Sequence, residues 1–141
     1  MDRDDLVCRT RTQVRFSDVD SMGVVWHGNY IKLFEDGREA FGNRYSINYM
    51  DFYSKGVLIP IVKINCEYKK PLKYGDTAVI ETRFVNCDAA KLQYEYTIYR
   101  NNTDEIVATG SSLQVFLNMD MELLLDFPPF YYEWKKKHNL I

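Results

Sequence analysis

Two spacings of apolar residues divide the chain into a helical part and a part rich in strands. Apolar or small residues recur three and four positions apart at Tyr30, Leu33, Phe34, Gly37, Ala40 and Phe41. This spacing places them on one face of a helix, because an α-helix has about 3.6 residues per turn. A glycine inside a helix costs about 1 kcal/mol relative to alanine. We therefore expect the helix to pass very close to a sheet or a ligand at Gly37.

Alternation of apolar and polar residues, weak before this helix and clearer after it, predicts strands on both sides of it. The expected strands are residues 8–16, 62–69, 78–84, 91–98 and 106–117. In the first of them, Val14 and Phe16 should share one face, opposite a row of arginines. Short turns separate the last three strands, which indicates an antiparallel meander. Short helices are expected at residues 48–55 and 130–138.

A strand, a central helix and four long strands, in that order, predict an α+β fold. We expect one domain over residues 1–141, since the chain has the usual length of a single domain. One helix covers only part of so wide a sheet, so the sheet should wrap around it. The uncovered face and edges should then meet a second copy of the chain in a symmetric dimer.

Composition and charge exclude several classes of protein. The formal net charge of −2 disfavours a dedicated nucleic-acid-binding protein, which usually carries a basic excess. The cysteines, Cys8, Cys66 and Cys87, are widely separated, and with only two histidines they form no zinc signature. No apolar run approaches the roughly 20 residues of a membrane span, and no signal peptide is evident. We therefore expect a cytoplasmic protein with reduced thiols, no bound metal and no membrane insertion.

The candidate chemistry lies between the first strand and the helix, in residues 16–30. Asp18 and Asp20 precede a glycine-containing turn, and the helix begins shortly afterwards. Free N–H groups at a helix start can hold a carbonyl oxygen that becomes negative in a transition state. A carboxylate opposite them can act as a base towards water or attack directly. This combination suits hydrolysis of a thioester, whose thiolate leaves readily, although acids before a helix are often only solvated or capping residues.

The same stretch resembles the signature of the 4-hydroxybenzoyl-CoA thioesterase family of hotdog proteins. The signature, D-x-D, then G-[VI]-V-[YFW]-[HYN] and a tyrosine, is matched by Asp18, Asp20, Gly23, Val24, Val25, Trp26, His27 and Tyr30. The likeness resumes at residues 68–71, 74–76 and 108–110, and so covers nearly the whole chain. It implies a hotdog fold, in which an antiparallel sheet of five or six strands wraps around a central helix. It also implies homodimers, often paired into homotetramers, with active sites at the dimer interface.

The resemblance further implies a substrate and residue roles. The substrate would be an acyl-CoA or acyl-carrier-protein thioester, and no cofactor would be needed. The catalytic carboxylate maps onto Asp20, and the backbone N–H that polarises the thioester carbonyl maps onto His27, whose imidazole has an open role. Candidate substrate-binding residues are Gly23, Val25, Trp26, Tyr30, Lys69 and Lys70, with Lys73 and Arg83 as further candidates for the phosphates of coenzyme A. Trp26 and Tyr30 fit a pocket wall or the core equally well.

Several alternatives remain open. Asp18 is expected to organise the loop rather than to take part in the reaction. A related thioesterase branch uses an acid on the helix, which Glu35 or Glu39 could supply. A hotdog hydratase or dehydratase typically carries an H-F-P-type motif that this chain lacks, and a non-catalytic acyl-thioester binder would not need the full signature.

Overall fold

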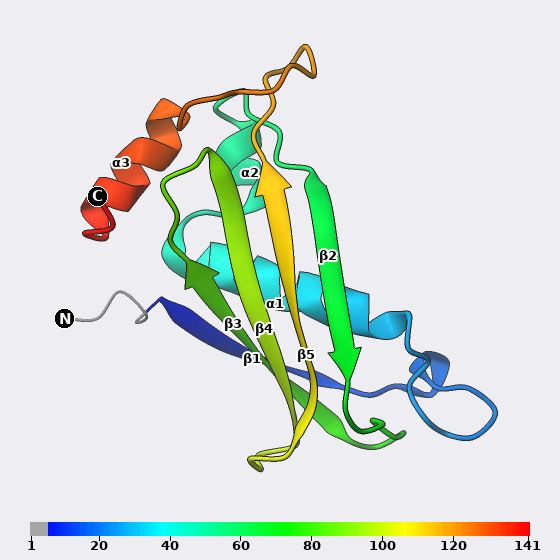
Figure 1. The fold of residues 1–141 in the computed structure, drawn as a ribbon. Helices are drawn as coiled ribbons and strands as arrows, with labels where there is room; N and C mark the ends of the chain where they lie inside the picture. Colours follow the sequence, from blue (N-terminus) through cyan, green and yellow to red (C-terminus); the bar gives the residue numbers. More distant parts are fainter. Residues whose placement is uncertain (1–5) are drawn as a thin grey trace.

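A five-stranded antiparallel sheet forms the frame of the computed structural model, which describes residues 6–141 (Figure 1). Its strands are β1 (Val7–Gln13), β2 (Ile61–Tyr68), β3 (Thr77–Val85), β4 (Lys91–Arg100) and β5 (Ile106–Val115). Across the sheet the order is β1-β3-β4-β5-β2, and each neighbouring pair is antiparallel. The predicted meander is therefore confirmed as β3, β4 and β5.

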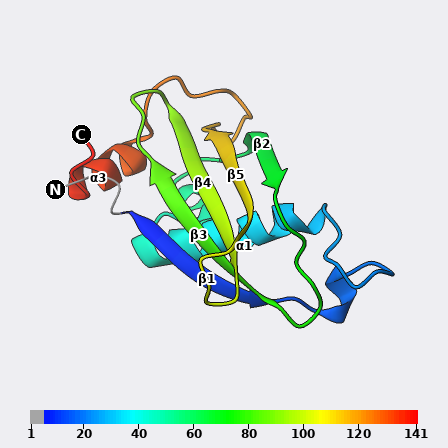
Figure 2. The same cartoon turned by 60° about the horizontal axis from the view of Figure 1, so that its bottom comes forward.

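Within residues 6–141, three α-helices accompany the sheet: α1 (Asn29–Tyr45), α2 (Tyr49–Tyr53) and α3 (Pro129–Lys137). The longest, α1, crosses one face of the sheet and packs against β1, β3 and β4 (Figures 1 and 2). Asn48 caps α2 by accepting a hydrogen bond from the Asp51 N–H. In α3, Trp134 lies edge-on to Phe84 at a ring-centroid distance of 5.2 Å. The predicted α+β class and the helix-wrapping sheet are confirmed.

Two glycines allow α1 to lie directly on the sheet. A Cβ atom at Gly37 would lie 2.4 Å from Oγ1 of Thr82 and 2.7 Å from Cγ2 of Ile80. A Cβ atom at Gly110 in β5 would lie 2.5 Å from Cε2 of Phe34, a fully buried residue of α1. The close approach predicted at Gly37 is therefore made to the sheet rather than to a ligand.

The first strand is shorter than its alternation predicts. It ends at Gln13, and Phe16–Asp18 form a 3₁₀ turn instead. The reason is local, because the Asp18 carboxylate accepts a hydrogen bond from the Arg15 N–H at 2.9 Å and turns the chain away from the sheet. Phe16, expected on the same face as buried Val14, is consequently 78% exposed. The prediction of a strand through residues 14–16 was wrong for this reason.

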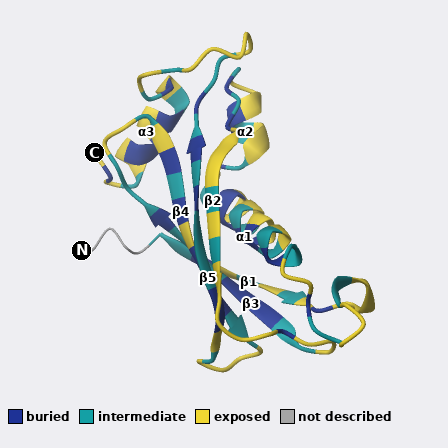
Figure 3. Ribbon diagram, turned by 45° about the vertical axis from the view of Figure 1, so that its right-hand side comes forward, coloured by how far each residue is buried: buried dark blue, intermediate teal, exposed yellow. Residues whose placement is uncertain are grey.

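Strand β2 forms one edge of the sheet and is mostly exposed (Figure 3). Val62 is 56% exposed and Tyr68 is 50% exposed, whereas in β3 and β4 buried residues alternate with more exposed ones. Each end of β2 contacts a different part of the molecule. Ile61 lines a cleft beside α2, and the Tyr68 hydroxyl donates a hydrogen bond to the His27 carbonyl at 3.0 Å.

No helix within residues 6–141 is long and apolar enough to cross a membrane.

Candidate active site

Asp20 holds the tight turn that carries it. Its Oδ1 accepts hydrogen bonds from the N–H groups of Met22 at 2.8 Å and Val24 at 3.4 Å. Gly23 completes the turn with a φ of +79°, a left-handed conformation that glycine adopts without strain. Within residues 6–141, Oδ2 of Asp20 accepts no hydrogen bond, and the side chain is exposed. One carboxylate oxygen thus shapes the turn while the other is available for chemistry.

Asp18 ties this turn to the start of α1. Its carbonyl accepts hydrogen bonds from the Trp26 N–H at 3.1 Å and from Nδ2 of Asn29 at 3.0 Å. The Val25 N–H donates to the Leu72 carbonyl at 2.7 Å, which anchors the same segment to the loop after β2. Asp18 therefore organises the loop, as expected, and keeps the Asp20 turn next to the helix start.

The start of α1 presents unused backbone donors. In the described part of the chain, the N–H groups of His27 and Gly28 donate no hydrogen bond. The positive end of the helix dipole adds to their attraction for a developing negative charge. The His27 imidazole is exposed and contacts the rings of Trp26 and Tyr68 at centroid distances of 5.1 and 6.0 Å. Free N–H groups at a helix start can polarise a carbonyl oxygen, and this role of the His27 N–H stays a prediction.

Gly28 is a feature of the site that sequence reasoning did not single out. A Cβ atom there would lie 2.0 Å from Cζ3 of the Trp26 indole. Only glycine therefore fits beneath this ring in its present position, and Trp26 itself is 55% exposed. The glycine is visible in the sequence, but its contact with the indole is not.

Two of the predicted pocket residues belong to the core of the single chain. Tyr30 is only 3% exposed, and its hydroxyl accepts a hydrogen bond from the Leu72 N–H at 3.1 Å. Burial raises the pKa of Tyr30, so the hydroxyl stays protonated at neutral pH. Val25 is also buried. Both residues anchor the helix start to the core, whereas the neighbouring Trp26 is exposed to solvent.

The basic candidates are spread over different parts of the fold. Nζ of Lys69 lies 3.4 Å from Glu67, and Nζ of Lys70 lies 3.2 Å from Glu105, so both are in exposed ion pairs. Lys73 lies closer to the D-x-D turn, because its backbone pairs with Val24 in an isolated bridge. Arg83 is on β3, opposite Val7 of β1. The structure therefore brings the backbone of Lys73 to the turn and leaves Arg83 elsewhere.

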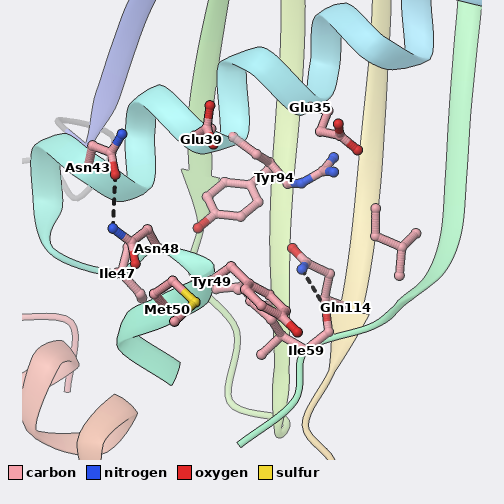
Figure 4. A pocket seen from close by; sticks show the side chains of 13 residues that line it. Glu35, Glu39, Asn43, Ile47, Asn48, Tyr49, Met50, Ile59, Tyr94 and Gln114 are labelled. Atoms are coloured by element: carbon pink, nitrogen blue, oxygen red, sulfur yellow. Dashed lines mark hydrogen bonds between the residues drawn. The ribbon is translucent and has the colours of Figure 1, made fainter. Parts of the chain in front are cut away.

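A cleft of about 580 Å³ lies away from Asp20, between α1, α2 and the sheet (Figure 4). Glu35 and Glu39, the alternative helical acids, line it, but Asp20 and His27 do not. Within residues 6–141, no three His, Cys, Asp or Glu side chains come together as metal ligands would. The cleft of a single chain is therefore separate from the Asp20 turn.

Comparisons with known proteins agree with this arrangement. The thioesterase-like superfamily matches residues 14–135. The Bacillus subtilis protein named "Putative acyl-CoA thioesterase YneP" is 35% identical over 128 residues, which are 91% of this chain and 92% of that protein. A 1,4-dihydroxy-2-naphthoyl-CoA hydrolase from Crocosphaera subtropica is 26% identical over 110 residues, or 74% of this chain and 78% of the relative.

A solved thioesterase structure has the same fold as this chain. The DHNA-CoA thioesterase from Staphylococcus aureus superimposes with a TM-score of 0.83 at 25% sequence identity, covering 94% of this chain and 91% of that one. The predicted hotdog fold is therefore confirmed. Sequence and structure together place the chain in the thioesterase-like superfamily of hotdog proteins.

Proposed function

We propose that this protein hydrolyses an acyl-CoA thioester to a free acid and the thiol of coenzyme A. The observation that carries the proposal is the link between Asp18 and the helix start, which holds the Asp20 turn beside the free N–H groups of His27 and Gly28. Membership of the superfamily supports it, and so do the names of relatives that act on acyl-CoA substrates.

In the proposed mechanism, the N–H of His27 binds the carbonyl oxygen of the thioester, with Gly28 as a second donor. These donors stabilise the negative charge that develops on that oxygen, and they need little reorganisation because they are already free. Oδ2 of Asp20 removes a proton from water as the water oxygen attacks the carbonyl carbon. The carbon–sulfur bond then breaks, the acid forms, and the thiolate takes up a proton.

Direct attack by Asp20 is the alternative route to the same products. It would form a mixed anhydride between the carboxylate and the acyl group, which water then hydrolyses. A single turnover in water enriched in ¹⁸O tests the nucleophilic route. Label in the Asp20 carboxylate would support nucleophilic attack followed by entry of water at that carboxyl carbon, whereas label only in the released acid is expected both of the general-base route and of anhydride hydrolysis at the acyl carbon.

We further propose that two copies complete the site by pairing their β2 edges, with pairing of dimers into a homotetramer. Edge strands carry unpaired backbone groups, and the exposed β2 is such an edge. If two copies pair antiparallel about a two-fold axis, the Tyr68 end of one β2 meets the Ile61 end of the other. The helix start and Asp20 turn of one copy would then lie beside the cleft of its partner, and that cleft would hold part of the substrate.

Thiol release from purified protein tests the activity. We expect release from acyl-CoA substrates, and we use the matching acyl-carrier-protein thioesters to decide between the two carriers. Binding of acyl-CoA without any release would contradict the proposal and favour a non-catalytic acyl-thioester binder.

A cytoplasmic location remains a prediction of the sequence.

A further inference from the structure

The end of β2 is joined to the start of α1 by one side chain. Tyr68, the last residue of β2, donates from its hydroxyl to the His27 carbonyl at 3.0 Å. The end of the strand and the start of the helix lie side by side at this point (Figures 1 and 2). The hydrogen bond connects residues that are 41 positions apart in the sequence. It therefore links the sheet to the backbone of the proposed reaction site.

Aromatic contacts fix the ring of Tyr68. The ring lies edge-on to Tyr30 at a centroid distance of 5.1 Å and edge-on to His27 at 6.0 Å. Tyr30 is itself held in the core by its hydrogen bond from the Leu72 N–H. Partial burial of the hydroxyl raises the pKa of Tyr68, so the hydroxyl keeps its proton at neutral pH. Tyr68 is consequently a donor with a fixed direction.

The His27 carbonyl belongs to the same peptide group as the Gly28 N–H. This carbonyl accepts two hydrogen bonds, one from the Tyr30 N–H at 3.2 Å and one from the Tyr68 hydroxyl. Hydrogen bonds in a chain polarise one another, so a bond accepted by the oxygen of a peptide makes its N–H a stronger donor. The Gly28 N–H donates no hydrogen bond within residues 6–141. It is therefore both free and strengthened.

The two free N–H groups of the helix start differ in what holds their peptides. The His27 N–H shares a peptide with the Trp26 carbonyl, which accepts from the Asn29 N–H at 2.9 Å. That hydrogen bond lies within the helix start. The Gly28 peptide is held by a side chain of the sheet as well. Its plane is thus fixed relative to the sheet, and a fixed donor needs no reorganisation when charge develops.

We propose that Tyr68 is a positioning residue of the reaction site, which orients and strengthens the Gly28 N–H through the His27–Gly28 peptide. This inference rests on the proposed thioesterase function, in which the Gly28 N–H is the second donor to the thioester oxygen. Tyr68 has no contact with the carbonyl or the attacking water in this role. Its contribution grows as negative charge develops on the oxygen, so it should affect kcat more than KM.

Tyr68→Phe removes the hydroxyl and keeps the ring against Tyr30. For acyl-CoA hydrolysis, kcat should fall about three- to tenfold, as for loss of one ordinary hydrogen bond, and KM should change less than about twofold. Tyr132→Phe removes a similarly exposed hydroxyl from α3 and should leave both constants unchanged. An unchanged kcat in Tyr68→Phe would overturn the inference. So would a rise in KM alone, which would make Tyr68 a substrate-binding residue.

Double variants test whether Tyr68 acts through Gly28. Gly28→Pro removes the N–H, and φ at this position is −65°, the angle of proline. In that background Tyr68→Phe should cause no further loss of kcat, whereas in His27→Pro it should cause the full loss. Gly28→Ala is the control, because its Cβ meets the same Trp26 indole while the N–H remains. Multiplying losses in Gly28→Pro would contradict action through this N–H.

A nuclear magnetic resonance measurement tests the contact without turnover. His27–Gly28 is the only histidine–glycine pair in the chain. Histidine labelled with ¹³C at the carbonyl and glycine labelled with ¹⁵N therefore select this one peptide. In Tyr68→Phe both resonances should move to lower frequency, because the carbonyl loses a hydrogen bond while the aromatic ring remains. Tyr132→Phe should leave them in place, and unchanged resonances in Tyr68→Phe would overturn the inference.

The two kinds of measurement separate this inference from the proposed function. Shifted resonances in Tyr68→Phe with no hydrolysis by the wild type would uphold the action of Tyr68 on the Gly28 peptide and overturn the thioesterase. Hydrolysis with equal kcat in the wild type and Tyr68→Phe, and unchanged resonances, would overturn the role of Tyr68 and uphold the thioesterase.

Discussion

The N-terminal end of α1 and its C-terminal half carry polar groups under very different conditions. At the N-terminal end, Asp20 and His27 are exposed and lie within eight positions of each other in the sequence. Beside the C-terminal half, Gln114 and Tyr94 are buried, and the cleft combines residues from α1, α2, β4 and β5. The first region is a continuous segment that is shaped by hydrogen bonds within it and anchored to the loop after β2. The second exists only once the sheet has formed around the helix.

This difference separates two tasks. Reactive groups of the proposed mechanism lie on a segment whose geometry is set by local hydrogen bonds, such as those of Asp20 to Met22 and Val24. The polar groups of the cleft are held by the buried sheet, where an unpaired atom cannot be satisfied by a small movement. Substitutions in the first region should therefore change the rate of reaction, and substitutions in the second should change stability or substrate preference.

The largest effect is expected for Asp20→Asn. Asparagine keeps an oxygen that can accept from the Met22 and Val24 N–H groups, so the turn should survive. It removes the base, and kcat should fall by about 10²–10⁴. Thiol release under saturating acyl-CoA measures the loss, and circular dichroism confirms the fold. A folded variant with near-normal kcat would show that Asp20 only shapes the turn.

Assembly should have the next largest effect, because the proposed site takes its two regions from different copies. Diluting the wild-type protein below its dimer dissociation constant should abolish most of the activity per chain. Light scattering gives the mass and thiol release gives the activity across the same dilution series. Val62→Asp, which places a charge on the exposed β2 edge, should shift both curves to higher concentration. A fully active monomer at nanomolar concentration would contradict the shared site.

A pair of glycine substitutions compares the rigidity of the two regions. In Gly110→Ala, the new Cβ would lie 2.4 Å from the Asn65 carbonyl oxygen and 2.5 Å from the buried Phe34 ring. We expect the free energy of unfolding to fall by about 1–3 kcal/mol. In Gly28→Ala, the three atoms nearest to the new Cβ all belong to the exposed Trp26 indole, which can turn aside, so the loss should be below about 0.5 kcal/mol. Urea unfolding measures both, and equal losses would contradict the comparison.

The same contrast explains how much the sequence could predict. The stripe from Tyr30 to Phe41 and the alternation in β3 and β4 are local patterns, and they predicted the elements that the structure contains. The D-x-D signature is also local. The cleft was not predictable, because Ile59, Tyr94 and Gln114 come together only through strand pairing across the sheet. The early end of β1 was missed because alternation does not reveal that the Asp18 side chain caps a turn.

A smaller effect is expected for the His27 side chain. In His27→Ala the backbone N–H remains, and the imidazole makes only ring contacts within the described residues, so kcat should fall less than about tenfold. His27→Pro removes the N–H itself and should cost about 10²–10³ in kcat if that group holds the oxyanion. Because the His27 N–H donates no hydrogen bond within the described residues, the proline variant should still fold, and circular dichroism checks this. A large loss in folded His27→Ala would make the imidazole a catalytic group.

The smallest effect should come from the two lysines after β2. If Lys69 and Lys70 contact the phosphates of coenzyme A, removing both should raise KM about two- to fivefold without changing kcat, because the exposed Nζ groups interact through water. The increase should disappear at high salt, where ionic screening already weakens such contacts. Steady-state kinetics at low and high ionic strength measure it, with Lys137→Ala on α3 as the matched control. An unchanged KM at low salt would show that both lysines serve only their ion pairs with Glu67 and Glu105. Lys73, whose backbone pairs with the Asp20 turn, would then be the next basic residue to substitute.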